Sequence, residues 1–172
     1  LYLDESTLTL LGPIRACWMA CGQQLTIPIA PHRSQETQHL FGAYDWATNT
    51  VTVVPKPAKK ARHFIDFLEY LFMEVYPHDN LVLVIDNAPF HHSHQVKAFL
   101  TVFEHRVRVF WLPPYSPELN LIERFWKHLK DHACPNKLFP TLDQVIHNVQ
   151  RMVTAQNRPG DPSRILFSND FH

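Results

Sequence analysis

The run Leu81–Ile85 is apolar at every position, and it constrains the fold more than any other segment of the chain. A strand with one face in water alternates apolar and polar side chains, so an unbroken apolar run is typical of a strand covered on both faces. Such strands are usually the central parallel strands of an α/β sheet. Asp86 follows directly. Because ligands gather outside the carboxyl ends of strands in open α/β sheets, we expect Asp86 to face a crevice.

Strand patterns and helix patterns alternate along the rest of the chain, with turn-forming residues between them. The final helix has Thr141 and Gln144 in capping-box spacing. This order favours a mixed sheet with helices on its faces. The predicted elements are strands over 1–4, 38–46 and 50–54, a helix from Phe64 to Pro77, the strand 81–85, a helix over 93–104, a strand over 107–112, and helices capped by Ser116 and by Thr141.

Size, charge and cysteine content narrow the class of protein. The 172 residues suffice for one domain with its own core, and no apolar run approaches the roughly 20 residues of a membrane span. The 16 Lys and Arg residues balance the 16 Asp and Glu residues, so contacts with nucleic acid would have to come from local patches. Cys17, Cys21 and Cys134 form no C-x-x-C pair, which favours buried thiols in a reducing, cytoplasmic compartment.

Three acids stand where carboxylates can converge on one crevice. Asp4 and Asp86 each follow an expected strand, and Glu123 lies off the apolar stripe of the helix after Ser116. A lone Asp more often caps the next element. Three convergent carboxylates raise one another's pKa unless cations hold them, and hard oxygen ligands favour Mg²⁺ or Mn²⁺ over zinc. Two such ions would clamp the oxygens of a phosphoryl displacement.

Three motifs contain these acids: YLDES from Tyr2, VIDNAPFHHS from Val84 and LPPYSPELNLIERFWKHLK from Leu112. They resemble motifs of the catalytic domain of the DDE transposases, in the bacterial insertion-sequence branch of the mariner-like superfamily. Asp4, Asp86 and Glu123 match the three acids of that family, and the spacing between the last two is close to the family's own. The segment 17–24 is similar to its W-x-x-x-G-x stretch.

The resemblance implies a ribonuclease H-like fold: a mixed five-stranded sheet with helices on both faces, in which the strands of Asp4 and Asp86 are neighbours. It implies metal-dependent cleavage of DNA at transposon ends and strand transfer of the 3′-hydroxyl into target DNA. Asp4 and Asp86 would jointly hold one Mg²⁺ or Mn²⁺ ion, and Glu123 would help to hold a second. Residues 1–172 would form the catalytic domain, acting as a homodimer in the bacterial cytoplasm at the nucleoid, with a helix-turn-helix region expected before Leu1.

The same resemblance suggests residues that support the acids. Asn87 and His91 are signature positions, and His91 would support Asp86 or contact a phosphate. Asn120 would either orient the Glu123 carboxylate or cap its helix. Lys127 and Lys130, beside Glu123, would hold DNA phosphates. The family commonly has Pro at Leu121, a change from which we expect little consequence.

Several residues have competing interpretations. His91, His92 and His94 could be a zinc site, but without a cysteine pair solvated histidines at a helix start are favoured. Glu5 should point to the face of its strand opposite Asp4, and Glu118 serves a helix dipole, so neither is expected to bind metal. A solvated face and a DNA contact are equally favoured for the basic segment 56–62. The tryptophans are assigned to the core; they are Trp18, Trp46, Trp111 and Trp126.

Two other functions stay open on the sequence alone. A domesticated or inactive transposase domain would keep the fold and bind DNA or protein without cutting, although all three acids are present. A host nuclease of the same fold, such as a Holliday-junction or RNA-hybrid cutter, would use similar acids. The N-L-I-E segment favours a transposase over these nucleases.

Overall fold

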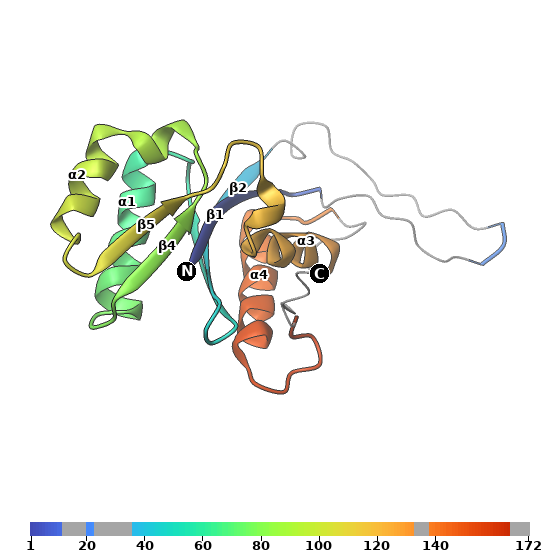
Figure 1. Ribbon diagram of the computed structural model, residues 1–172. Coiled ribbons are helices and arrows are strands. Elements are labelled where there is room, and N and C mark those ends of the chain that lie inside the picture. Colours follow the sequence, from blue (N-terminus) through green and yellow to red (C-terminus); the bar gives the residue numbers. More distant parts are fainter. Residues whose placement is uncertain (12–19, 23–35, 133–137, 166–172) are drawn as a thin grey trace.

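Five strands form one mixed sheet in the order β3-β2-β1-β4-β5 (Figure 1). The computed structural model describes residues 1–11, 20–22, 36–132 and 138–165. The first three strands are an antiparallel meander, and β4 runs parallel to both β1 and β5. The strands are β1 (Tyr2–Thr9), β2 (Thr37–Asp45), β3 (Thr50–Lys56), β4 (Leu81–Ile85) and β5 (Val107–Trp111).

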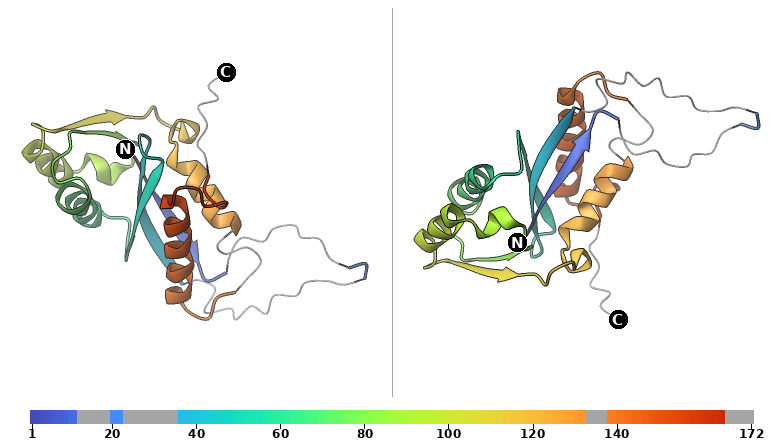
Figure 2. Two further views of the ribbon diagram at one scale, coloured as in Figure 1. Left: turned by 90° about the horizontal axis from the view of Figure 1, so that it is seen from below. Right: turned by 90° about the horizontal axis from the view of Figure 1, so that it is seen from above.

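Helices cover both faces of the sheet, as predicted: α1 and α2 pack on one face, and α3 and α4 on the other (Figures 1 and 2). Successive residues of β2 divide between the two cores: Phe41 packs with α1, and Leu40 packs with α3. The helices are α1 (Ala61–Tyr70), which continues as a π-helical turn over Leu71–Val75, α2 (His94–Val102), α3 (Ile122–His132) and α4 (Leu142–Asn157).

The helix starts follow the capping rules. The Ser93 hydroxyl accepts from the Val96 amide before α2, and the Thr141 hydroxyl accepts from the Gln144 amide before α4, each at 3.4 Å. These bonds satisfy amide groups that have no partner inside the helix. The capping prediction for Thr141 is therefore confirmed. No helix within the described ranges is long and apolar enough to span a membrane.

The prediction that β4 is covered on both faces is wrong. Val82 is 50% exposed, because α3 and α4 pack over the meander and leave that face of β4 and β5 open. The first strand also extends past Asp4 to Thr9, since β2 pairs with it along its whole length. Asp4 therefore lies inside the strand rather than at its end.

The helix expected directly after Ser116 begins later. A 3₁₀ turn covers Pro117–Leu119, Asn120 is extended, and α3 starts at Ile122. The Ser116 side chain makes no capping bond, and Leu119 is exposed rather than part of the apolar stripe. Leu121 is buried in the core.

Some assignments of single residues to the core are also wrong. Trp126 is buried, but Trp46 and Trp111 are exposed, as is the thiol-bearing residue Cys21. Trp18, Cys17 and Cys134 lie outside the described residues, as does most of the segment 17–24.

Gly42 lets α3 lie directly against the sheet. A Cβ atom at this position would stand 2.5 Å from the Trp126 indole and 2.8 Å from Ile122 Cδ1, closer than atoms can pack. Gly42 is the β2 partner of Asp4 in the antiparallel ladder. The missing side chain therefore brings the first turn of α3 close to Asp4.

Candidate active site

Asp4, Asp86 and Glu123 line one pocket of about 580 Å³. They come from β1, from the residue after β4 and from the first turn of α3. The structure thus brings together the three acids that the sequence predicted to converge. Asn87, Asn120 and the proline-rich loop after β5 complete the pocket wall.

Asp4 lies where the sheet divides. Tyr2 of β1 is registered against Val84 of β4, and beyond this pair β1 continues along β2 alone. Burial raises the pKa of Asp4 to about 8, and the negative charges of Glu123, Glu5 and Asp86 act in the same direction. This is the effect expected when carboxylates converge without a cation between them.

Asp86 is held by two donors on one of its oxygens. Its Oδ1 atom accepts from the Ala88 amide at 3.1 Å and lies 2.9 Å from Nδ1 of His91. The hydrogen bond with His91 is the main reason that the pKa of Asp86 lies below its usual value, against the effect of burial. The Asp86 side chain remains 44% exposed toward the pocket.

His91 is fully buried, so the prediction of a solvated histidine is wrong for this residue. The 3₁₀ turn Pro89–His92 carries its ring inward against Phe64 and Phe90, with ring centroids at 4.3 and 4.2 Å. Its Nε2 atom lies 3.0 Å from Oε1 of Glu5. Burial lowers the pKa of His91, but hydrogen bonds with Asp86 and Glu5 outweigh it and raise the pKa to about 9.

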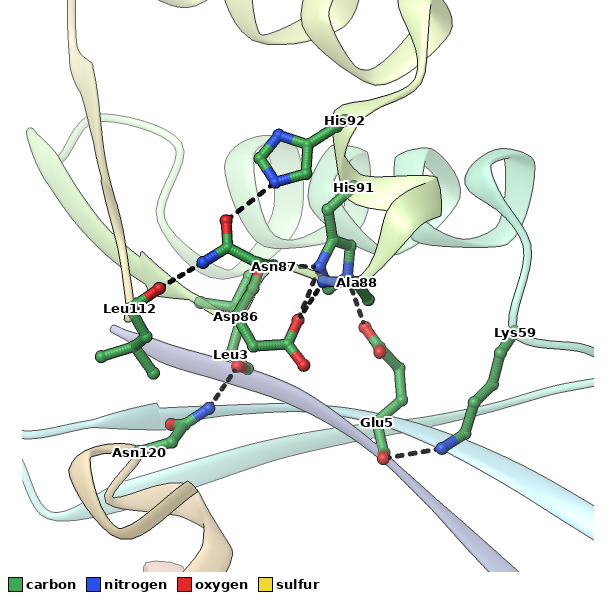
Figure 3. A network of polar contacts seen from close by, with 10 residues as sticks. All are labelled: Leu3, Glu5, Lys59, Asp86, Asn87, Ala88, His91, His92, Leu112 and Asn120. Carbon is green, nitrogen blue, oxygen red and sulfur yellow. Dashed lines mark hydrogen bonds and ion pairs between the residues drawn. The ribbon is translucent and has the colours of Figure 1, made fainter. Parts of the chain in front are cut away.

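Asn87 joins the loops that follow β4 and β5 (Figure 3). Its Nδ2 atom donates to the Leu112 carbonyl, and its Oδ1 atom lies 2.9 Å from Nε2 of His92. The His92 ring in turn packs on Trp111, with centroids 4.3 Å apart. Asn87 therefore fixes the pocket wall through protein contacts.

Asn120 has neither of the two predicted roles. Its Nδ2 atom donates to the Leu3 carbonyl at 2.9 Å, which ties the start of α3 to β1 (Figure 3). Its Oδ1 atom is buried without a hydrogen-bond partner, and the residue lines the pocket. The Glu123 amide donates a hydrogen bond to the main-chain carbonyl of Asn120, at 3.0 Å.

Lys127 and Lys130 lie further along α3 and do not line the pocket, and neither does Glu118. Within the basic segment 56–62, Lys59 donates to the main-chain carbonyl of Glu5 at 2.9 Å. Neither this contact nor the one between Glu5 and His91 was predicted from the sequence. The alternation of side chains along β1 placed Glu5 on the correct face but gave no partner there.

The donor set suits a hard divalent cation. Three carboxylate-bearing residues and Asn120 line the pocket, and among the described residues no cysteine does. In the part of the chain that the structure describes, no three His, Cys, Asp or Glu side chains already stand in the arrangement of a metal site.

The site thus consists of three acids, from β1, from the residue after β4 and from α3, that line one pocket of a mixed five-stranded sheet. Residues 1–146 match the family model described as DDE superfamily endonuclease, and the chain belongs to this family. It is 30% identical over 160 residues to the insertion element IS630 uncharacterized 39 kDa protein of Shigella sonnei, covering 92% of this chain and 46% of that protein.

A shorter match, 31% identical over 65 residues, is to the uncharacterized protein y4pE/y4sA of Sinorhizobium fredii (strain NBRC 101917 / NGR234) and covers 38% of this chain and 44% of that one. The chain thus spans about half the length of the curated relatives it matches.

Solved structures with the same fold include complexes of a transposase. The Mos1 transposase paired-end complex with left transposon end has a TM-score of 0.70 at 20% identity, over 94% of this chain and 48% of that one. The Mos1 Strand Transfer Complex has a TM-score of 0.67 at 20% identity, over 89% of this chain and 46% of that one. These similarities confirm the predicted ribonuclease H-like fold.

Proposed function

We propose that residues 1–172 form the catalytic domain of a bacterial insertion-sequence transposase. The observation that carries this proposal is the single pocket lined by Asp4, Asp86 and Glu123, three acids from distant parts of a chain of the DDE family. The presence of all three acids in one pocket also favours an active enzyme over a domain that only binds DNA.

The proposed reaction consists of two phosphoryl transfers. Water attacks a phosphorus atom at the transposon end, and the bond to the 3′ oxygen breaks, which leaves a 3′-hydroxyl and a 5′-phosphate. The 3′-hydroxyl then attacks a phosphodiester of the target, forms a new bond and displaces the target's own 3′ oxygen. Neither step changes the oxidation state of any atom.

Asp4, Asp86 and Glu123 are proposed to hold Mg²⁺ or Mn²⁺, with Asp4 and Asp86 sharing one ion and Glu123 helping to hold a second. Bound divalent cations activate the attacking oxygen and stabilise the leaving oxygen of such a displacement. Two structures of the same fold, Mos1 paired-end complexes, contain Mn and Mg. These structures support divalent metal use, and the number of ions in this chain is part of the proposal.

The surrounding residues are proposed to position the reacting groups. His91 holds the Asp86 carboxylate, Asn87 braces the two loops of the pocket, and Asn120 links α3 to β1. Lys127 and Lys130 are proposed to contact DNA phosphates beside the pocket, as cations on an exposed helix flank do in protein–DNA complexes.

The proposed partner is DNA, both transposon end and target, bound by a homodimer in the bacterial cytoplasm at the nucleoid. The Mos1 transposase paired-end complex with left transposon end supports DNA as the partner class. We further propose that a helix-turn-helix region in a longer protein recognises the transposon end. The match to the Shigella sonnei relative covers only 46% of that protein, which leaves room in it for such a region.

Replacing Asp86 tests the proposal. Asp86→Asn keeps an oxygen that accepts from Ala88 but removes the charge that holds a cation, so we expect a folded protein without Mn²⁺-dependent nicking of supercoiled plasmid. Glu118→Gln, which changes an exposed acid outside the pocket, should nick as the wild type does. A nicking-competent Asp86→Asn protein would contradict the assignment. Melting curves of both variants establish that they are folded.

A further inference from the structure

Asp4 and Glu5 are neighbours on β1, yet they serve opposite faces of the sheet. Asp4 lines the acid pocket beside α3, whereas Glu5 points toward the turn before α2 and is absent from the pocket lining. The Glu5 side chain is only 5% exposed. A buried carboxylate is costly unless it is paired, so its partner is informative.

That partner is His91, which connects Glu5 to Asp86 (Figure 3). The fully buried ring places Nε2 at 3.0 Å from Glu5 Oε1 and Nδ1 at 2.9 Å from Asp86 Oδ1. Phe64 and Phe90 pack on the ring. A ring held at both nitrogens and packed against two aromatic side chains has little freedom to rotate.

We infer that Glu5 is a positioning residue, which through the His91 ring fixes the orientation of the Asp86 carboxylate toward the acid pocket. This inference rests on the proposed function. Within the described residues the polar contacts of the Asp86 side chain fall on Oδ1, so the other oxygen, Oδ2, is the one presented to a cation. Without Glu5, Nε2 of His91 loses its buried acceptor, and the ring no longer holds Asp86 in one orientation.

The inference gives Glu5 a role that differs from direct coordination. Outer partners that orient a ligand typically change metal affinity by about 10-fold to 100-fold when they are removed. A direct ligand would act independently of His91. A residue that acts through His91 must lose its effect once His91 is gone.

The experiment is calorimetric titration of Mn²⁺ into the DNA-free protein. We expect Glu5→Ala to weaken Mn²⁺ binding by about 10-fold, and Glu5→Gln, whose amide oxygen can still accept from Nε2, to retain most of the affinity. His91→Ala should weaken binding similarly, and adding Glu5→Ala to it should cause no further loss. Glu118→Ala, at an exposed acid outside the pocket, is the matched control.

Melting temperatures show which variants are folded, and if Glu5→Ala is unfolded, Glu5→Asp replaces it, because Asp keeps the charge but lacks the reach to His91. Unchanged Mn²⁺ affinity in a folded Glu5→Ala or Glu5→Asp protein overturns the inference. Additive losses from Glu5→Ala and His91→Ala overturn it too, since they indicate direct coordination. A wild-type protein that binds no Mn²⁺ contradicts the proposed function instead.

Discussion

Asp4 has the most strongly perturbed carboxyl group of the three pocket acids. Its pKa rises from 3.8 to about 8, mainly because of burial, so between these pH values the folded protein keeps a proton that the unfolded chain releases. The stability linked to this group is therefore fully present at acidic pH and is lost as the pH rises through the folded-state pKa.

We predict from this shift that the melting temperature of the metal-free protein falls between about pH 4 and about pH 8, and that Asp4→Asn removes much of the fall. Thermal melting in EDTA at a series of pH values measures it. The raised pKa of His91 adds a decline in melting temperature at the upper end of this pH range. The difference in melting temperature between wild type and variant is therefore the quantity that reports Asp4. Parallel curves for the two proteins would refute the prediction.

At the residue scale, the three pocket acids were predictable from the sequence, but the residues that contact them were not. Asp86 and Glu123 were identifiable because each sits in a motif, and strand alternation gave the direction of Glu5. The burial of His91 depends on Phe64, which belongs to a different element, and its bond to Glu5 spans 86 residues of sequence. Local pattern carries no information about such a contact.

At the scale of elements, the packing of α3 on β2 sets the position of Glu123. Only a residue without a Cβ atom lets Trp126 lie so close to β2 at position 42. We predict that Gly42→Ala lowers the free energy of unfolding by about 1–3 kcal/mol, the usual cost of overpacking a core. Urea denaturation provides the measurement.

The companion variant is Trp126→Phe, which removes the indole atoms nearest to the added methyl group. The double variant should lose less unfolding free energy than the sum of the two single-variant losses, because the smaller ring makes room for the new side chain. Strictly additive losses would mean that Gly42 acts through something other than its contact with Trp126.

Element boundaries were less predictable than element types. The strands β2 and β3 and the start of α4 were located well, because alternation and capping are local signals. The start of α3 was misplaced, since Asn120 leaves helical geometry to reach the Leu3 carbonyl, 117 positions away. The exposure of Val82 was missed for a related reason: an apolar sequence does not reveal which face a helix will cover.

At the scale of the whole molecule, the net charge sets an expectation for the proposed binding of DNA. Its acidic and basic residues cancel, 16 against 16, so no overall positive field attracts a polyanion. We predict weak binding to short duplexes without sequence preference, declining steeply with added salt as counterions compete for the phosphates. Fluorescence anisotropy over a salt series tests this. Tight, sequence-specific binding at physiological salt would contradict it.

The alternation of side chains along β1 makes the site sensitive to the register of this strand. Consecutive residues advance by about 3.3 Å and point to opposite sides, so the sheet separates the acid pocket, which Asp4 lines, from the buried side that holds Glu5. If β1 slipped by one residue against its neighbours, the side chains on the two sides of the sheet would be exchanged. An acid would then be buried without the imidazole that pairs with Glu5, and the pocket would receive a side chain other than Asp4.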